Sequence, residues 1–223
     1  MGTGVALEGR TGTVVEAHLA RVDAAGSFRH RHLEAMLTAT GALASRDLAD
    51  AVHLLCAVHG RHPGVTDIAQ AACAPGAARD WLGEAAGAFD RERLYLVRLT
   101  SAIGPMPSTP GATQTENALL AQRHAIETLA RSERGGCALG AATALVKDWR
   151  SLRLLLDHAA DRAGVDCPVC TLPDDDSIAG AIAAGTNNVS SERALGFGAE
   201  QLLLQHRGLL DLMEARAGAR GPF

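Results

Sequence analysis

Residues 113–164 run TQTENALLAQRHAIETLARSERGGCALGAATALVKDWRSLRLLLDHAADRAG. Apolar residues recur at helical spacing on both sides of the Ser-Glu-Arg-Gly-Gly break at residues 132–136, which predicts two long helices joined as a hairpin. Either Thr113 or Thr115 is expected to cap the first helix. We expect the rest of the chain to pack on this hairpin.

The second helix of the hairpin carries a row of small residues. Gly136, Gly140 and Ala144 follow one another at intervals of four, so they lie on one side of the helix. A neighbouring backbone could approach closely along this row. That neighbour is either another helix of the chain or a helix of a second copy.

The composition predicts an all-α fold, because 47% of the residues are hydrophobic, alanine is frequent and no alternating β-branched runs occur. We expect a single-domain antiparallel bundle of about six to eight helices spanning residues 1–223. Its core covers residues 45–216, and residues 1–12 and 217–223 are loosely ordered. Outside the hairpin, helices are expected over residues 14–22, 28–37, 45–60, 65–73, 78–103, 177–185 and 191–216.

Charge and sequence pattern exclude several classes of function. A net charge of -4 and an aromatic content of 3% argue against nucleic-acid binding. The N-terminus lacks a basic flank before an apolar run, and no window holds the roughly 18 apolar residues of a membrane helix. Five cysteines fit a reducing compartment better than a disulfide framework. We therefore expect a soluble cytoplasmic protein.

Polar residues interrupt the apolar stripes of four expected helices. They are Glu92, Gln122, Asp148 and His206, with His124 on a flank. If the helices pack as one bundle, these side chains could converge in the core. Two carboxylates with a histidine and an amide have the ligand chemistry of a metal site in a helical bundle.

The alternative is that these groups are paired within the core. A di-metal bundle of the ferritin-like type uses a Glu-x-x-His pair on each of two helices, and this chain has none. Glu92, Asp148 and His206 would then be core or edge groups that pair with Arg153 or Arg93.

His59, Arg61 and His62 surround a tight turn at the end of an apolar helix. The two histidines could point the same way and, with the arginine, bind an anion or a metal. They could also act as acid and base in an enzyme. The alternative is a polar helix end that hydrogen-bonds its own turn.

Cys167 and Cys170 form a Cys-x-x-Cys motif, which occurs in redox enzymes and in zinc sites. The redox motif of such enzymes needs a strand-to-helix setting, which an all-helical chain does not offer. Zinc needs further ligands, and Cys73, His158 or a second copy of the motif could supply them. The alternative is a chance pair of cysteines in a loop. The run at residues 30–32, His-Arg-His, could contact an acidic partner or form a charged surface patch.

Other catalytic signatures are absent from the sequence. It has no phosphate-binding glycine loop, no Gly-x-Ser-x-Gly motif and no His-Glu-x-x-His motif.

A resemblance to a known family rests on four segments, residues 104–111, 122–124, 132–142 and 148–149. With them, the stretch 53–164 resembles an uncharacterised family of helical proteins from high-GC alphaproteobacteria. The resemblance implies an all-helical fold and carries no activity. The long antiparallel helices are also similar to ferritin-like bundles, but both Glu-x-x-His pairs are missing.

The sequence favours a binding protein with a polar pocket for a metal or a small polar ligand, and it indicates no particular cofactor. The alternative is a homo-oligomeric structural or interaction protein that has no catalytic site and self-associates through its helices. An enzyme is a third hypothesis. The expected pocket residues are Glu92, Gln122, His124, Asp148 and His206, with His59, Arg61 and His62 as a second group.

Overall fold

The computed structural model describes the backbone of residues 2–221 and the side chains of residues 12–221. Over the described residues the chain is all-helical, with nine α-helices, one short 3-10 helix and no strand. This confirms the predicted fold class. In order, the elements are α1 (Gly2–Ala25), η1 (Ser27–Arg29), α2 (Arg31–Thr38), α3 (Gly41–His59), α4 (Val65–Ala72), α5 (Ala77–Ala102), α6 (Ala112–Ala130), α7 (Cys137–Ala163), α8 (Asp175–Gly185) and α9 (Val189–Arg220).

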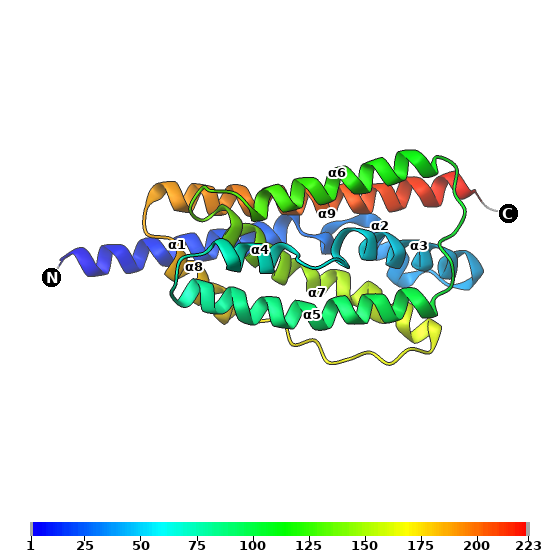
Figure 1. Ribbon diagram of the computed structural model, residues 1–223, viewed down its shortest axis with the longest axis horizontal. Helices are drawn as coiled ribbons and strands as arrows, with labels where there is room; N and C mark the ends of the chain where they lie inside the picture. Colours follow the sequence, from blue (N-terminus) through cyan, green and yellow to red (C-terminus); the bar gives the residue numbers. More distant parts are fainter. Residues whose placement is uncertain (1, 222–223) are drawn as a thin grey trace.

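Helix α7 is the centre of the bundle. Helices α6 and α9 lie side by side along one edge of the molecule, α5 lies along the opposite edge, and α7 packs against all three (Figure 1). Leu145, Trp149, Leu152 and Leu155 of α7 are buried among them. Each large apolar side chain buried in this way stabilises the fold by about 1.5–3 kcal/mol.

The predicted hairpin is formed by α6 and α7. Helix α6 begins directly after Gly111, whose φ of 78° lies in the left-handed region that glycine adopts without strain. The caps predicted at Thr113 and Thr115 are wrong, because the helix starts ahead of both residues. Thr115 is instead buried, and its hydroxyl accepts a hydrogen bond from Arg216 at 3.0 Å.

The row of small residues on α7 faces α9. A Cβ added to Gly140 would overlap the backbone carbonyl of Leu195, and a Cβ added to Gly198 would overlap that of Cys137. The close approach expected for this row therefore occurs between two helices of the same chain. The row is not available to a second copy.

The first helices also pack on the bundle. Helix α1 starts at Gly2, ahead of the start predicted at residue 14. His18 of α1 is buried, and its Nε2 lies 3.0 Å from the Thr143 hydroxyl of α7. Leu33 and Met36 of α2 belong to the same core. Residues 12–38 therefore contribute to the bundle.

Helix α9 continues to Arg220, beyond the end predicted at residue 216. Guanidinium nitrogens of Arg216 and Arg220 each lie 2.6 Å from the buried carboxylate of Asp50 in α3. Asp47 accepts a further bond from Arg220 at 2.7 Å. This ion-pair cluster fastens the last turns of α9 to α3.

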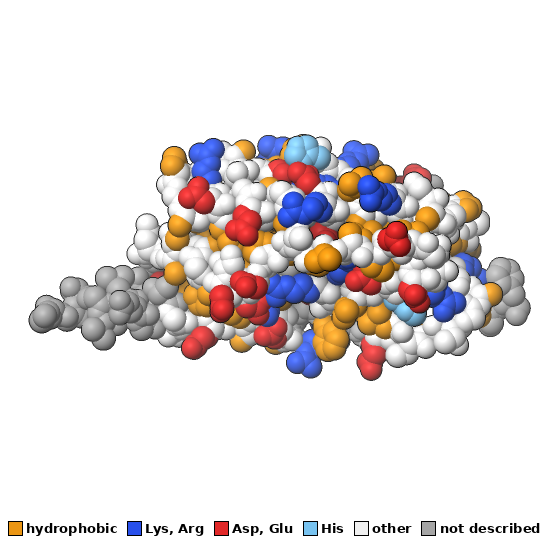
Figure 2. Space-filling model, turned by 90° about the horizontal axis from the view of Figure 1, so that it is seen from below, with side chains coloured by type: hydrophobic (Ala, Val, Ile, Leu, Met, Phe, Trp, Pro, Cys, Tyr) orange, Lys and Arg blue, Asp and Glu red, His pale blue; other side chains and the backbone are white. Residues whose placement is uncertain are grey.

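On the face shown in Figure 2, hydrophobic side chains are interspersed with acidic and basic ones. Among the described residues, none of the helices has the length and hydrophobicity needed to span a bilayer.

Candidate functional site

Asp148 of α7 is buried and forms three hydrogen bonds. The backbone N–H and the hydroxyl of Ser27 donate to it at 2.6 Å, and His206 Nδ1 lies 2.6 Å from Oδ2. Burial alone would raise the pKa of Asp148, but the bonds from His206 and Ser27 outweigh it and lower that pKa. The carboxylate is therefore ionised, so His206 carries a hydrogen on Nδ1.

His59 lies beside this group, in the core. Its ring centroid is 5.0 Å from that of His206 and 5.3 Å from that of Trp149. Burial, followed by the nearby His206 and Arg93, holds the pKa of His59 well below its usual value, so the ring is neutral. Within the described part of the chain, Nε2 of His59 and Nε2 of His206 have no hydrogen-bond partner.

Glu92 belongs to a separate buried pair. Its carboxylate accepts hydrogen bonds from Arg153 at 2.8 Å and from Trp149 Nε1 at 3.0 Å. Arg153 also donates to Asp157 at 2.6 Å. The pairing of Glu92 with Arg153 is one of the alternatives that the sequence left open. Glu92 and Asp148 are thus held by different partners.

The other residues of the two expected sites are dispersed. Gln122 is half-buried and donates to the backbone carbonyl of Gln205 at 3.2 Å, whereas His124 is exposed on α6. Arg61 and His62 are exposed in the loop after α3, while His59 of the same turn faces the core. The structure therefore does not bring His59 and His62 together.

Cys167 and Cys170 are exposed and free. Among the described residues, neither belongs to a group of three or more possible metal ligands.

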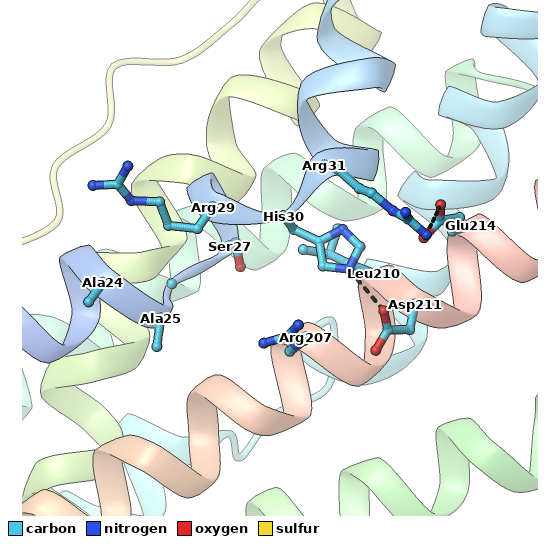
Figure 3. A pocket seen from close by; sticks show the side chains of 11 residues that line it. Ala24, Ala25, Ser27, Arg29, His30, Arg31, Arg207, Leu210, Asp211 and Glu214 are labelled. Atoms are coloured by element: carbon cyan, nitrogen blue, oxygen red, sulfur yellow. Dashed lines mark hydrogen bonds and ion pairs between the residues drawn. The ribbon is translucent and has the colours of Figure 1, made fainter.

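A pocket of about 360 Å³ lies between residues 24–31 and α9. One wall carries two polar pairs: His30 Nε2 lies 3.0 Å from Asp211, and Arg31 lies 3.1 Å from Glu214. Arg207 stands beside the same hollow (Figure 3).

Ser27 also lines this pocket. Because Ser27 donates two hydrogen bonds to Asp148, the pocket wall is joined directly to the buried group around that carboxylate. A substitution or a bound ligand that moves Ser27 would therefore alter the hydrogen bonds of Asp148 in the core.

The described residues hold two groups of three side chains whose ligand atoms all lie within 4.8 Å of one another. One group is His30, Asp211 and Glu214, in the pocket wall. The other is His62, Asp67 and Asp90, on the surface. In the second group Arg93 already bridges the two carboxylates, at 2.5 Å and 3.2 Å.

Sequence reasoning missed Ser27, Arg207, Asp211 and Glu214, and it described residues 30–32 as a run that contacts an acidic partner or forms a charged surface patch. The signal was weak, because the acidic partner of that run lies some 180 residues later on the exposed side of α9. Asp50 was missed as well. Its burial could have been predicted more easily, because Asp50 interrupts an otherwise apolar helix.

A model of a family of unknown function, DUF6975, matches residues 22–221, so the chain belongs to that family. No curated protein and no solved structure matches the chain. The matched range contains the buried groups around Asp148, Glu92 and Asp50 and the whole pocket.

Proposed function

We propose that this member of the DUF6975 family is a binding protein whose pocket between residues 24–31 and α9 holds a small anionic molecule. The observation that carries the proposal is the guanidinium group of Arg207, which borders the pocket without a partner among the described residues. A guanidinium group binds a carboxylate or a phosphate through two parallel N–H bonds.

The charge balance of the pocket supports an anion. Asp211 is engaged by His30 at 3.0 Å, and Glu214 is engaged by Arg31 at 3.1 Å. The pocket is lined by three arginines, Arg29, Arg31 and Arg207, and by only these two carboxylates, so one positive charge is left over even when His30 is neutral. A ligand with a negative group would complement it at this position.

The size and lining of the pocket restrict the ligand further. A volume of about 360 Å³ lies at the lower end of the range for small-molecule sites. Ala24, Ala25 and Leu210 supply apolar surface beside the charged groups. A small organic acid or phosphate ester with a short apolar part would fit this combination.

A divalent metal ion is the second candidate, favoured by the grouping of His30, Asp211 and Glu214 within 4.8 Å. Metal binding would require both polar pairs of the wall to open. It would also place a cation near the positive charge of Arg207. We rank it second for these reasons.

Isothermal titration calorimetry would test the proposal, with inorganic phosphate and succinate as probes of the anion site and zinc chloride as the probe of the metal site. Replacing Arg207 by Gln should weaken binding of the preferred anion about tenfold or more, the loss expected for charge-assisted hydrogen bonds. Arg98→Gln is the matched control, because Arg98 is exposed on α5 and does not line this pocket.

Anion binding that is lost in R207Q and retained in R98Q would support the proposal. Anions that bind all three proteins equally, or none of them, would contradict it. Zinc binding that is lost on His30→Ala or Asp211→Asn, without anion binding, would replace the proposal by the metal site.

A further inference from the structure

Residues 165–174, here called the strap, connect α7 with α8. The strap contains no helix, turn or bend, and it passes along the outer side of α5 (Figure 1). It carries Cys167 and Cys170, which are both exposed, whereas the other three cysteines of the chain are buried or half-buried. The two strap cysteines are therefore the most accessible thiols of the protein.

The strap is fastened to buried groups of the bundle. The guanidinium group of Arg153, which pairs with Glu92 at 2.8 Å, donates to the backbone carbonyl of Pro168. The Tyr95 hydroxyl lies 3.6 Å from Cys167 Sγ. Both anchors act on residues 167 and 168, within the Cys-x-x-Cys motif itself.

Further along, the strap is held from the surface side. Arg91 Nε donates to the Thr171 hydroxyl at 2.7 Å, and Leu172 packs against the hydrophobic core. Arg91 is exposed, so this anchor can be removed without disturbing the core.

A disulfide between Cys167 and Cys170 does not fit the strap as it lies. Bonded cysteines have Cα atoms about 4.4–6.8 Å apart. Three residues of extended chain span about 10 Å. The strap would have to bend between the two cysteines, and Pro168, whose carbonyl is held by Arg153, stands at that point.

We propose that Cys167 and Cys170 form a reversible redox pair, and that their disulfide releases the strap from Arg153 and Tyr95. One thiolate attacks a small-molecule disulfide such as oxidised glutathione, giving a mixed disulfide and one free thiol. The second thiolate then displaces the other thiol. Overall, the two cysteines lose two protons and two electrons, and the oxidant becomes two thiols.

This modification site is independent of the pocket beside Arg207. Its consequence follows from the buried guanidinium of Arg153, which loses an acceptor when the Pro168 carbonyl moves away. The oxidised state should therefore detach the strap from α5 and α7 and loosen the packing of Leu172.

The test is equilibration of the full chain in buffers of defined ratio of reduced to oxidised glutathione, followed by alkylation and mass spectrometry. The wild type should form a disulfide within the peptide that holds both cysteines. Cys170→Ser should instead accumulate a glutathione adduct on Cys167. Cys73→Ser, which changes a half-buried thiol, should behave as the wild type.

Two further measurements test the release of the strap. Thermolysin should cut the oxidised protein before Leu172 faster than the reduced protein. Arg91→Ala should raise the equilibrium constant for disulfide formation about two- to tenfold, the factor that one hydrogen bond supplies. Arg98→Ala, on the same helix without a partner among the described residues, should leave it unchanged.

Two results would overturn the inference. In one, both thiols stay free in oxidised glutathione. In the other, the disulfide forms with no change in cleavage at Leu172 and with equal equilibrium constants for R91A and R98A.

Discussion

His206 Nδ1 lies 2.6 Å from Oδ2 of Asp148, joining α9 to α7 in the core of the bundle. The same carboxylate binds Ser27, so three segments far apart in the sequence meet at one ionised group. Because Ser27 also lines the pocket, this pair lies directly behind the proposed binding site.

Replacing Asp148 by Asn should destabilise the fold by about 3–5 kcal/mol, the cost of removing one partner from a buried pair. Urea unfolding at pH 7 would measure it. Asp161→Asn, an exposed position on the same helix, should change the free energy of unfolding by less than about 0.5 kcal/mol. Equal effects of the two variants would contradict the role assigned to Asp148.

Stability should fall as the pH drops below about 6.5, the unfolded pKa of histidine. In the folded state, burial lowers the pKa of His59 well below that value and the pKa of His18 to about 4. The unfolded chain then binds protons that the folded chain does not, so each histidine contributes up to about 1.4 kcal/mol of lost stability per pH unit.

His59→Phe keeps an aromatic ring among Phe89 and Trp149 and removes the titrating group. The slope of the unfolding free energy against pH, taken between pH 7 and pH 5, should decrease by up to about 1.4 kcal/mol per pH unit, which corresponds to one proton. Urea unfolding at four pH values from 5 to 8 would measure it. An unchanged slope would mean that His59 is protonated in the folded state.

Gly140→Ala should lower the free energy of unfolding by about 1–3 kcal/mol or more, because the new methyl group would overlap the Leu195 carbonyl where α7 meets α9. Gly87→Ala is the control, since Gly87 lies in α5 with open space around it. It should stabilise the helix by about 0.5–1 kcal/mol. Thermal unfolding of both variants would show whether their effects have opposite signs.

Asp50→Asn should release the end of α9, because it leaves Arg216 buried without a counter-charge and leaves Arg220 with Asp47 alone. Amide hydrogen exchange over residues 213–220 should become faster. Asp47→Asn removes a more exposed carboxylate, which pairs with Arg220 and Arg46 but not with Arg216, and it should have a much smaller effect. Unchanged exchange in D50N would show that other contacts hold this end.

The periodicity of single helices predicted several buried groups correctly. Glu92, Asp148 and His206 interrupt apolar stripes, and all three are buried. His59 could have been placed in the same way, because it follows Val52 and Leu55 at helical spacing and both are buried. The turn beside it, with Arg61 and His62, favoured a site at the helix end instead.

Periodicity could not predict which helices bring their polar groups together. Ser27 meets Asp148 across 121 residues, and His30 meets Asp211 across 181. Such pairs depend on how η1 and α2 pack against α7 and α9, which no local pattern records. The pocket was missed for this reason.

The most direct test of the binding proposal is a titration of the full chain with inorganic phosphate and with succinate. NMR would monitor the titration through the arginine Nε–H resonances, and the resonance of Arg207 would be assigned as the one that is lost in R207Q. We predict that the Arg207 resonance shifts with one of these anions and saturates, while the Arg98 resonance does not move. Shifts that are equal for both arginines, or absent at Arg207, would contradict the proposed anion site.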